Sequence, residues 1–357
     1  MTAATISVDG VSTAQSVAKL VRQMDDVSAA AGGRTVLDFS LLSGSSERVS
    51  PRWGAVLAAV LAGRYRGMHF EVDLPENAAA NTQMARAGLF CALAHHEGLN
   101  WSRFDEAQGR SLRRWAQDWE PAEPRAALFD FEGVEDVAAP AVLDDRLVAF
   151  VNADSYPRSE AEREQATVLH PWLRRLASTR GSRSDEAMLG NVSQIISALL
   201  ENVRVHGGLS SANDLCSVSA FVTKGSSGGD LLYLSVLDTG VGMPATLAQR
   251  DFDADVPTDM RVAAAFNGTI PLRERDRGRG LHGITCLVND FGGSLFAASG
   301  TMDGPTYVVD HHAGGDEDVH VDTDEGLGMT GTVVVVALPV LRRSRQDLRR
   351  DEYEAHR

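Results

Sequence analysis

The sequence is poor in aromatic residues and cysteines and has no surplus of positive charge. Its three cysteines, Cys91, Cys216 and Cys286, lie far apart in the 357 residues. None belongs to a CxxC pair or to a zinc-type spacing. This usage is typical of a reducing compartment, so we expect a cytoplasmic protein. The net charge of -15 disfavours a chain that coats nucleic acid or an anionic membrane.

Signals for export and membrane insertion are missing as well. Residues 1–5 lack the basic start and apolar stretch of a signal peptide, so we expect none. No uninterrupted apolar run approaches the roughly 18 residues of a membrane span. The chain is long, with 357 residues. A single hydrophobic core rarely grows much beyond about 250 residues, so we expect two domains.

The first 100 residues predict a small α/β domain, because strands and helices alternate along them. The expected elements are a strand at 34–40, a helix at 53–64, a strand at 69–74 and a helix at 80–94. Residues 101–184 form a connecting region of uncertain structure. One or two strands are compatible with its sequence, at 127–131 and 146–151.

The second half begins with an amphipathic helix. Its apolar residues Met188, Val192, Ile195 and Leu199 step by four, three and four, which places them on one buried face. The next positions on that face are Asn202 and His206. A polar side chain at a position expected to be core is costly unless something satisfies it. This stripe is therefore the first indication of a ligand.

Downstream elements complete a sheet with helices. We expect strands at 216–222, 231–237, 294–298, 305–310 and 332–338, and a helix from Leu281 to just before Gly292. Residues 245–277 form a long polar segment of uncertain structure, and residues 342–357 a charged tail.

Several side chains here suit a nucleotide. The amide oxygen of Asn202 suits Mg²⁺, although a buried Asn can also cap a backbone group. Asp238 ends an apolar strand, and its carboxylate can accept a hydrogen bond from an exocyclic amine such as adenine N6. Gly240 and Gly242 permit a close approach there, and Met243 could pack against a base. The alternative is an ordinary turn after a strand.

A second glycine loop precedes the helix at Leu281. Gly278, Gly280 and Gly283 bracket the expected helix start, where backbone N–H groups favour phosphate oxygens. Arg279 lies within the loop and could add positive charge toward a triphosphate. Three further arginines, Arg273, Arg275 and Arg277, alternate just before it. The alternative is a solvated basic loop.

Together, residues 199–207, 238–244 and 278–284 resemble the N, G1 and G2 boxes of the GHKL ATPase superfamily. Gly292-Gly293, Ser299-Gly300, Gly331-Thr332 and Leu338-Pro339 resemble the closing strands of its kinase-like members. The resemblance covers about residues 185–341. It implies a two-layer α/β sandwich, the Bergerat fold, with a mixed sheet and helices on one face.

The resemblance also implies the cofactors ATP and Mg²⁺. Asn202 would hold the metal, Asp238 would recognise adenine, with Thr332 near it, and the 278–283 loop would meet the phosphates. The expected cofactor-binding residues are Asn202, His206, Asp238, Gly240, Gly242, Met243, Gly278, Arg279, Gly280, Leu281, His282, Gly283 and Thr332.

One departure from the family pattern puts hydrolysis in doubt. Members that hydrolyse ATP carry a Glu one helical turn before the magnesium Asn, as a general base. Here that position is Ala198. Glu201 is adjacent to Asn202 instead and points about 100° away on a helix. It is the candidate catalytic residue. No convincing phospho-accepting histidine is found, which disfavours an autophosphorylating kinase.

Residues 1–100 resemble, more faintly, a STAS domain of the kind found in anti-sigma factor antagonists. The segments that carry this resemblance are 36–40, 49–54 and 84–90. Ser50 is the nearest match to a phosphorylated serine, and a helix cap is the alternative.

Together, these sequence features predict an ATP/Mg-binding regulatory protein. Nucleotide would order a lid over 245–277 and control binding to a protein partner, akin to anti-sigma partner switching. An active ATPase or a serine/threonine kinase is the alternative. We expect neither nucleic acid nor a membrane as partner. The sequence leaves undecided whether the protein forms a homodimer.

Overall fold

The computed structural model describes residues 4–29, 35–42, 49–66, 68, 70–73, 80, 83, 84, 87, 89, 146–150, 185–207, 216–224, 230–249, 255–269, 280–314 and 319–340. It is an α/β structure with two sheets. No helix in these ranges is long and apolar enough to cross a bilayer.

The larger sheet has seven strands. Across it run β4 (Arg146–Phe150), β5 (Cys216–Lys224), β6 (Asp230–Asp238), β10 (Gly331–Val340), β7 (Ser294–Gly300), β8 (Thr306–His312) and β9 (Val321–Asp324). Every neighbouring pair is antiparallel. The expectation of a mixed sheet was therefore wrong. Five of the strands fall where the sequence predicts them, and β4 confirms a strand at 146–150 in the connecting region.

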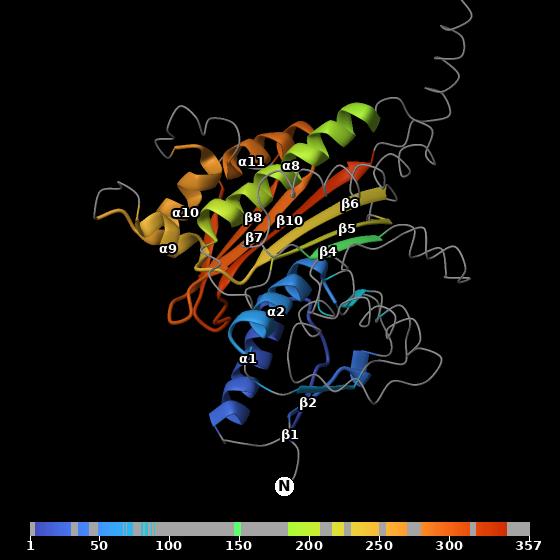
Figure 1. Cartoon of the computed structure of the whole chain (residues 1–357), viewed down its shortest axis with the longest axis vertical. Coiled ribbons are helices and arrows are strands. Elements are labelled where there is room, and N and C mark those ends of the chain that lie inside the picture. Colours follow the sequence, from blue (N-terminus) through green and yellow to red (C-terminus); the bar gives the residue numbers. More distant parts are fainter. Residues whose placement is uncertain are drawn as a thin grey trace, which may run out of the picture.

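Four helices cover one face of this sheet (Figure 1). They are α8 (Asp185–His206), α9 (Gly242–Ala248), α10 (Thr258–Asn267) and α11 (Leu281–Asp290). The apolar stripe of α8 is confirmed as core, since Val192, Ile195 and Leu199 are buried. The helix at Leu281 is confirmed, and it ends at Asp290 before Gly292.

The smaller sheet belongs to the N-terminal unit. It pairs β1 (Ala4–Ser7), β2 (Thr35–Asp38) and β3 (Phe70–Asp73) in parallel and in that order. The helices α1 (Ala14–Ala29) and α2 (Pro51–Gly63) connect the strands, and a short 3-10 turn, η1 (Ser40–Leu42), follows β2. Parallel strands joined by helices confirm the predicted α/β class of this unit. The predicted helix at 80–94 lies mostly outside the described residues.

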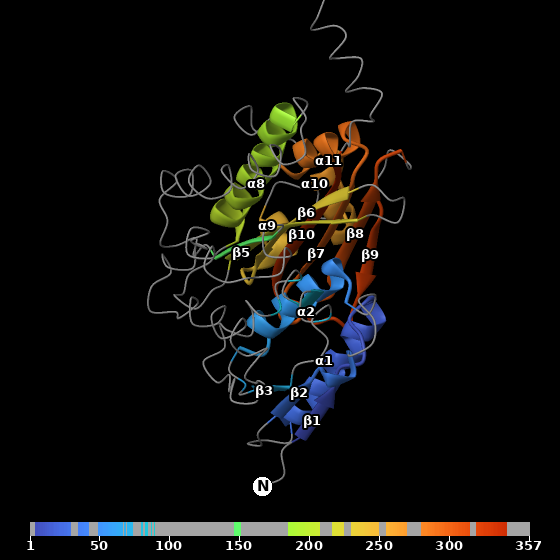
Figure 2. The same ribbon diagram turned by 90° about the vertical axis from the view of Figure 1, so that its right-hand side faces the viewer.

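Helix α2 explains how the two sheets meet. Its sequence is apolar on every side, and a helix of that kind must be buried all round. All residues from Gly54 to Ala62 are buried. Figure 2 shows α1 and α2 as a layer between the small sheet and the open face of the large one. The large sheet is therefore covered on both faces, which corrects the expectation of helices on one face only.

The strands of the large sheet are built for two covered faces. In β10 the odd-numbered Val333 and Val335 join the core of the N-terminal unit, while Val334 and Val336 join the core beneath the helices α8 to α11. A strand buried on both faces reads as a continuous apolar run rather than as an alternating one. The run 333–338 is the sequence signal for the second covered face. The boundaries at 100 and 185 stay a prediction.

Candidate functional site

A row of polar side chains crosses the helix-covered face of the large sheet at one end. The strand registers pair Cys216 with Asp238, Asp238 with Thr332, and Thr332 with Ser299. Successive side chains alternate between the faces of a strand. Asp238 therefore shares the face of Val236, and Thr332 that of Val334, on the side of α8 to α11. The antiparallel register thus gathers residues from four strands.

Asp238 is a buried carboxyl group in the middle of this row, with 4% of its surface exposed. Its Oδ1 accepts a hydrogen bond from the Gly240 backbone N–H at 2.9 Å, and the Thr332 backbone N–H donates to it as well. Burial nevertheless raises its pKa to about 7, against the lowering effect of these two bonds. The carboxyl group is thus held in place by backbone donors and poorly hydrated.

The hydroxyl groups beside it form a connected network. The Ser299 hydroxyl is fully buried and donates to the Gly331 carbonyl oxygen at 3.0 Å. Its oxygen accepts the Met243 backbone N–H at 2.8 Å and lies 3.0 Å from the Thr332 hydroxyl. Because the only Ser299 hydroxyl proton goes to Gly331, the Thr332 hydroxyl is the donor to Ser299. Ser299 had entered only as part of a closing strand, and no spacing signalled this role.

The glycines of the turn after β6 are required by close approach. A Cβ on Gly240 would overlap the Gly207 carbonyl oxygen at the end of α8. Gly242 has a φ of +80°, and a Cβ there would overlap the Gly300 carbonyl oxygen at the end of β7. Side chains at these two positions would push the turn away from α8 and from the sheet.

Asn202 and His206 lie on the last turns of α8, next to that same turn. The Gly207 carbonyl oxygen accepts the Val241 N–H at 2.7 Å, and the His206 carbonyl oxygen accepts the Thr246 hydroxyl at 3.0 Å. Asn202 is one helical turn before His206, about 6 Å along the axis. Its Nδ2 atom is buried, and among the described residues it has no hydrogen-bond partner. A buried polar atom without a partner among the described residues is a candidate contact for a ligand or an ordered water.

The second glycine loop is described only from Gly280 onward, so Gly278 and Arg279 lie outside the described residues. Gly280 is the N-cap of α11, and among the described residues no atom lies within 4 Å of a Cβ added there. No side chain of the described residues caps this helix start. Leu281 packs against the helix-side core, and Gly283 is partly buried in the first turn.

Two expected ligand residues are engaged elsewhere. The His282 Nδ1 atom lies 3.1 Å from the Phe266 carbonyl oxygen of α10, and its ring packs against Gly268. The Met243 side chain is partly buried against the helix-side core. Both therefore support the packing of α9, α10 and α11 around the site, which sequence spacing alone could not indicate.

The segment expected to form a lid contains helical structure. Residues 245–277 include the end of α9 and all of α10, whose Val262 and Phe266 are fully buried in the core beneath α8 to α11. The described part of this segment is therefore packed on the sheet. That nucleotide orders 245–277 stays a prediction.

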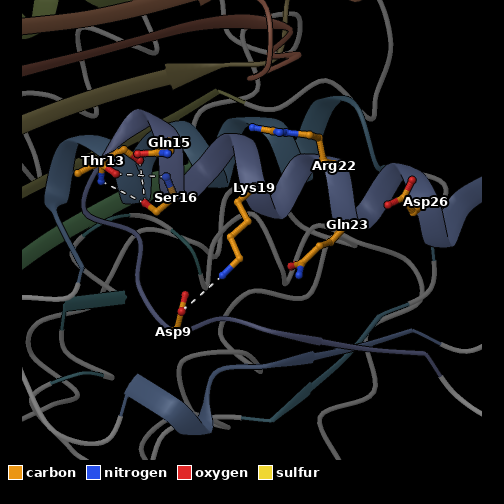
Figure 3. Close-up of a pocket in the computed structure, with 8 residues that line it drawn as sticks. All are labelled: Asp9, Thr13, Gln15, Ser16, Lys19, Arg22, Gln23 and Asp26. Atoms are coloured by element: carbon orange, nitrogen blue, oxygen red, sulfur yellow. Dashed lines mark hydrogen bonds and ion pairs between the residues drawn. The ribbon is translucent and has the colours of Figure 1, made fainter.

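A separate open hollow of about 540 Å³ runs along α1, away from this row (Figure 3). Several of its polar groups contact one another. Lys19 pairs with Asp9 at 3.5 Å, and the Thr13 and Ser16 side chains accept each other's backbone N–H groups. The buried Gln23 Oε1 atom, like Asn202 Nδ2, has no hydrogen-bond partner among the described residues. We take the Asp238 row as the candidate site because it alone of the two adds a buried carboxyl group with a raised pKa.

Comparisons with known proteins add little to this geometry. No family model matches the chain, and no curated protein matches it. Among solved structures, it is similar to the crystal structure of the 43K ATPase domain of Thermus thermophilus gyrase B in complex with an aminocoumarin. The identity is 20%, the match covers 37% of this chain and 32% of that chain, and the TM-score is 0.20.

Proposed function

We propose that the site beneath α8, α9 and α11 binds ATP with Mg²⁺ and that the chain belongs to the GHKL superfamily. Bound nucleotide would control the binding of a protein partner, as in anti-sigma partner switching. The described parts of the three sequence segments that resemble the family's boxes, 199–207, 238–244 and 280–284, converge on one face of one sheet. That convergence is what an ATP pocket of this kind requires.

The observation that carries the proposal is the buried Asp238 carboxyl group. A carboxylate has about four lone-pair sites, and the described contacts use two of them, from Gly240 and Thr332. The remaining acceptor capacity suits an amino group such as N6 of adenine. A guanine would bring a carbonyl oxygen to the same place, and two facing acceptors repel. We therefore expect ATP to bind in preference to GTP.

Asn202 supports the metal-bound end of the nucleotide. Its Nδ2 is buried and has no partner among the described residues, and it would gain one in a phosphate oxygen. The amide oxygen would be available to hold the metal. Mg²⁺ takes few protein ligands and keeps phosphate and water in its other positions, so a single amide oxygen fits. When bound, the ion would neutralise phosphate charge, and Asn202 would orient it.

A binding role is favoured over catalysis by the residue one turn before Asn202. Ala198 is buried there and offers no general base. Glu201 is partly buried and takes part in an interaction within the protein, and it is the candidate base that the sequence predicts. An ATPase or a serine/threonine kinase that uses Glu201 is the alternative, and Glu201→Gln would abolish its turnover while ATP affinity is retained.

Titration calorimetry with ATP, with and without Mg²⁺, tests the proposal on wild type and Asn202→Ala. The matched control is Asn191→Ala, since Asn191 lies on the same face of α8 about 16 Å away along the axis. We expect Mg-dependent binding in wild type and in Asn191→Ala, and a loss of at least about tenfold in Asn202→Ala, as for one charge-assisted contact. GTP serves as the competitor nucleotide.

Phosphate release on the same samples separates the two roles. Binding without release supports a nucleotide-gated regulator. Steady release that disappears in Glu201→Gln supports the enzyme. A wild type that binds neither ATP nor Mg-ATP contradicts the proposal altogether.

A further inference from the structure

The turn between β9 and β10, residues 325–330, connects the N-terminal unit with the Asp238 row. Leu327 and Met329 are fully buried in the core of the N-terminal unit, although they belong to the C-terminal half of the chain. A Cβ on Gly326 would come within 3.2 Å of the Ala18 Cβ on α1. At the other end of the turn, a Cβ on Gly63 of α2 would overlap the Thr330 hydroxyl. The turn therefore lies flat against α1 and α2.

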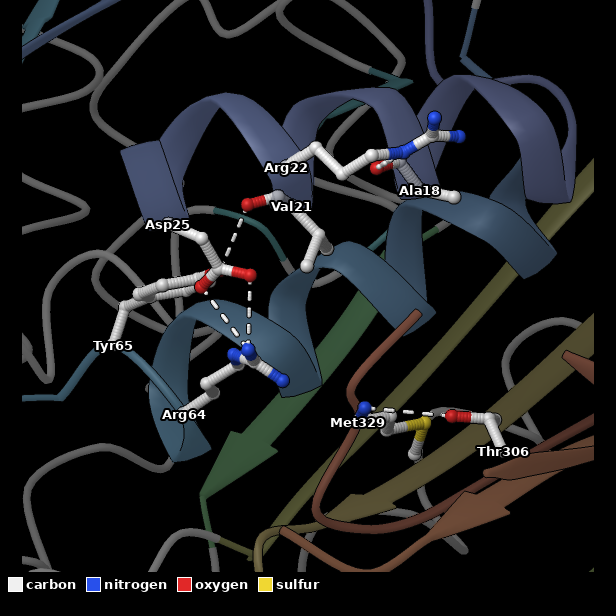
Figure 4. Close-up of polar contacts among 8 residues, drawn as sticks. All are labelled: Ala18, Val21, Arg22, Asp25, Arg64, Tyr65, Thr306 and Met329. Atoms are coloured by element: carbon white, nitrogen blue, oxygen red, sulfur yellow. Dashed lines mark hydrogen bonds and ion pairs between the residues drawn. The ribbon is translucent and has the colours of Figure 1, made fainter. Parts of the chain in front are cut away.

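Arg64 is the side chain that covers this turn. It follows the last residue of α2, and its Nη2 donates to both carboxylate oxygens of Asp25 on α1, at 3.1 and 2.9 Å (Figure 4). The Tyr65 hydroxyl lies 2.7 Å from Asp25 Oδ1 and completes the anchor. Gly328 has a φ of +55°, and a Cβ on it would overlap the Arg64 guanidinium. Guanidinium and turn backbone are thus in direct contact.

The far end of the turn is the start of the site. Gly331 follows it with a φ of +87°, and a Cβ on Gly331 would overlap the Asp238 carbonyl oxygen. The next residue, Thr332, donates its backbone N–H to the Asp238 carboxyl group. Met329 is held to the sheet as well, since its N–H donates to the Thr306 hydroxyl at 3.4 Å (Figure 4). Only three residues separate Gly328 from Thr332.

We propose that Arg64, anchored by Asp25, positions the 325–330 turn and thereby sets the nucleotide affinity of the Asp238 row. Arg64 is a positioning residue that acts through Gly328, Gly331 and Thr332, without touching nucleotide. The N-terminal unit then controls the site through this turn, so a change in the packing of α1 against α2 alters ATP affinity. By reciprocity, bound ATP alters the same packing. The inference rests on the proposed ATP binding.

The test compares ATP affinity by calorimetry in wild type, Arg64→Ala and Arg52→Ala. Arg52 is the matched control. It lies in the first turn of α2, at the other end from Arg64, and donates to Asp310 of β8 at 2.9 Å, but it has no described contact with the 325–330 turn. We expect Arg64→Ala to weaken ATP binding about five- to tenfold, within the usual range of coupling between sites. Arg52→Ala should bind like wild type.

A double variant separates positioning from a general loss of stability. In wild type, Gly328→Ala must displace the Arg64 guanidinium, whereas in Arg64→Ala the added methyl group has room. The loss of ATP affinity caused by Gly328→Ala should therefore be smaller in the Arg64→Ala background, and such non-additivity marks residues in contact. Equal losses in the two backgrounds contradict the inference.

Wild-type protein alone provides a second measurement if Arg64→Ala fails to fold. Saturating Mg-ATP should slow amide hydrogen exchange at Met329 and at Arg64, because the coupling is reciprocal. A wild type that binds ATP with no change at these amides, or an Arg64→Ala variant with wild-type affinity, overturns the positioning role alone. A wild type that does not bind ATP overturns the proposed function instead.

Discussion

Asp238 and Thr332 face each other across the β6–β10 pair, and the Thr332 backbone N–H donates to the Asp238 carboxyl group. The two residues lie 94 positions apart in the chain. Their pairing carries a buried carboxyl group into the helix-covered face of the sheet, beside the Thr332 hydroxyl.

The first prediction concerns the pH dependence of unfolding. Burial raises the Asp238 pKa from 3.8 to about 7, so between these values the folded protein binds a proton that the unfolded chain has released. The stabilisation from this group is greatest below pH 3.8 and is lost once the pH exceeds about 7. The free energy of unfolding of wild type, relative to Asp238→Asn, should therefore fall as the pH rises toward 7 and then level off.

Urea unfolding of both proteins at a series of pH values measures this difference. The subtraction removes the other titrating groups that the two proteins share. A difference that stays flat, or that grows with pH, contradicts the buried carboxyl group. Under the proposed function, ATP affinity should change in the opposite sense and rise with pH through about 7, because the ionised carboxylate is the acceptor.

The second prediction separates binding from stability at Asn202. An unpartnered buried N–H donor costs about 1–3 kcal/mol, and its replacement by an apolar group of similar size is neutral or stabilising. Asn202→Leu should therefore raise the free energy of unfolding by about 1 kcal/mol, or leave it unchanged, while ATP binding is lost. Chemical denaturation without nucleotide is the measurement. A large loss of stability would mean that Asn202 has a structural partner.

The third prediction concerns the turn at Gly242. In Gly242→Ala, the alanine would have a positive φ and its Cβ would overlap the Gly300 carbonyl oxygen. The substitution should therefore lower the free energy of unfolding by about 2–4 kcal/mol. Gly314 has the same φ of +80°, and no atom of the described residues lies within 4 Å of an added Cβ. Gly314→Ala should therefore lower the free energy of unfolding by only about 1 kcal/mol, the cost of holding an alanine at a positive φ. Equal losses in the two variants would show that close approach at Gly242 contributes nothing.

The fourth prediction concerns the core shared by the two sheets. Phe296 of β7 is 1% exposed, and its ring meets Trp53 of α2 edge-on, with centroids 5.1 Å apart. Phe296→Ala should lower the free energy of unfolding by about 3–5 kcal/mol. The exposed Met302 is the control, and Met302→Ala should change it by less than about 0.5 kcal/mol.

Because the N-terminal unit and the large sheet share this core, wild type and Met302→Ala should each unfold in one transition. Circular dichroism and tryptophan fluorescence should follow coincident curves. Two separated transitions would mean that the N-terminal unit and the large sheet unfold independently.

Local pattern predicted most of the individual elements. The stripe Val192, Ile195 and Leu199 identified α8, and the apolar runs identified β5, β6, β7, β8 and β10 at nearly their observed bounds. Helices α1, α9 and α10 and the short strands β1 and β9 were missed. Helix α1 does carry an apolar stripe at helical spacing, since Val17, Leu20, Val21 and Met24 are all buried, so its pattern was present in the sequence. Helix α10 is different, because only two of its side chains, Val262 and Phe266, are fully buried on the sheet. Tertiary packing rather than periodicity determines α10.

By itself, the sequence determined the candidate residues of the site: an Asn on a helix, an Asp before a glycine turn, and a glycine loop at a helix start. These are local features, because residue type and backbone freedom belong to single positions. Only the tertiary structure decided that Ser299 and Thr332 join Asp238, since the register of antiparallel strands pairs residues far apart in the chain. It also decided that α2 covers the second face of the sheet and that Arg64 lies on the turn leading to Thr332. The energy of such contacts comes from burial between distant segments, which no local pattern contains.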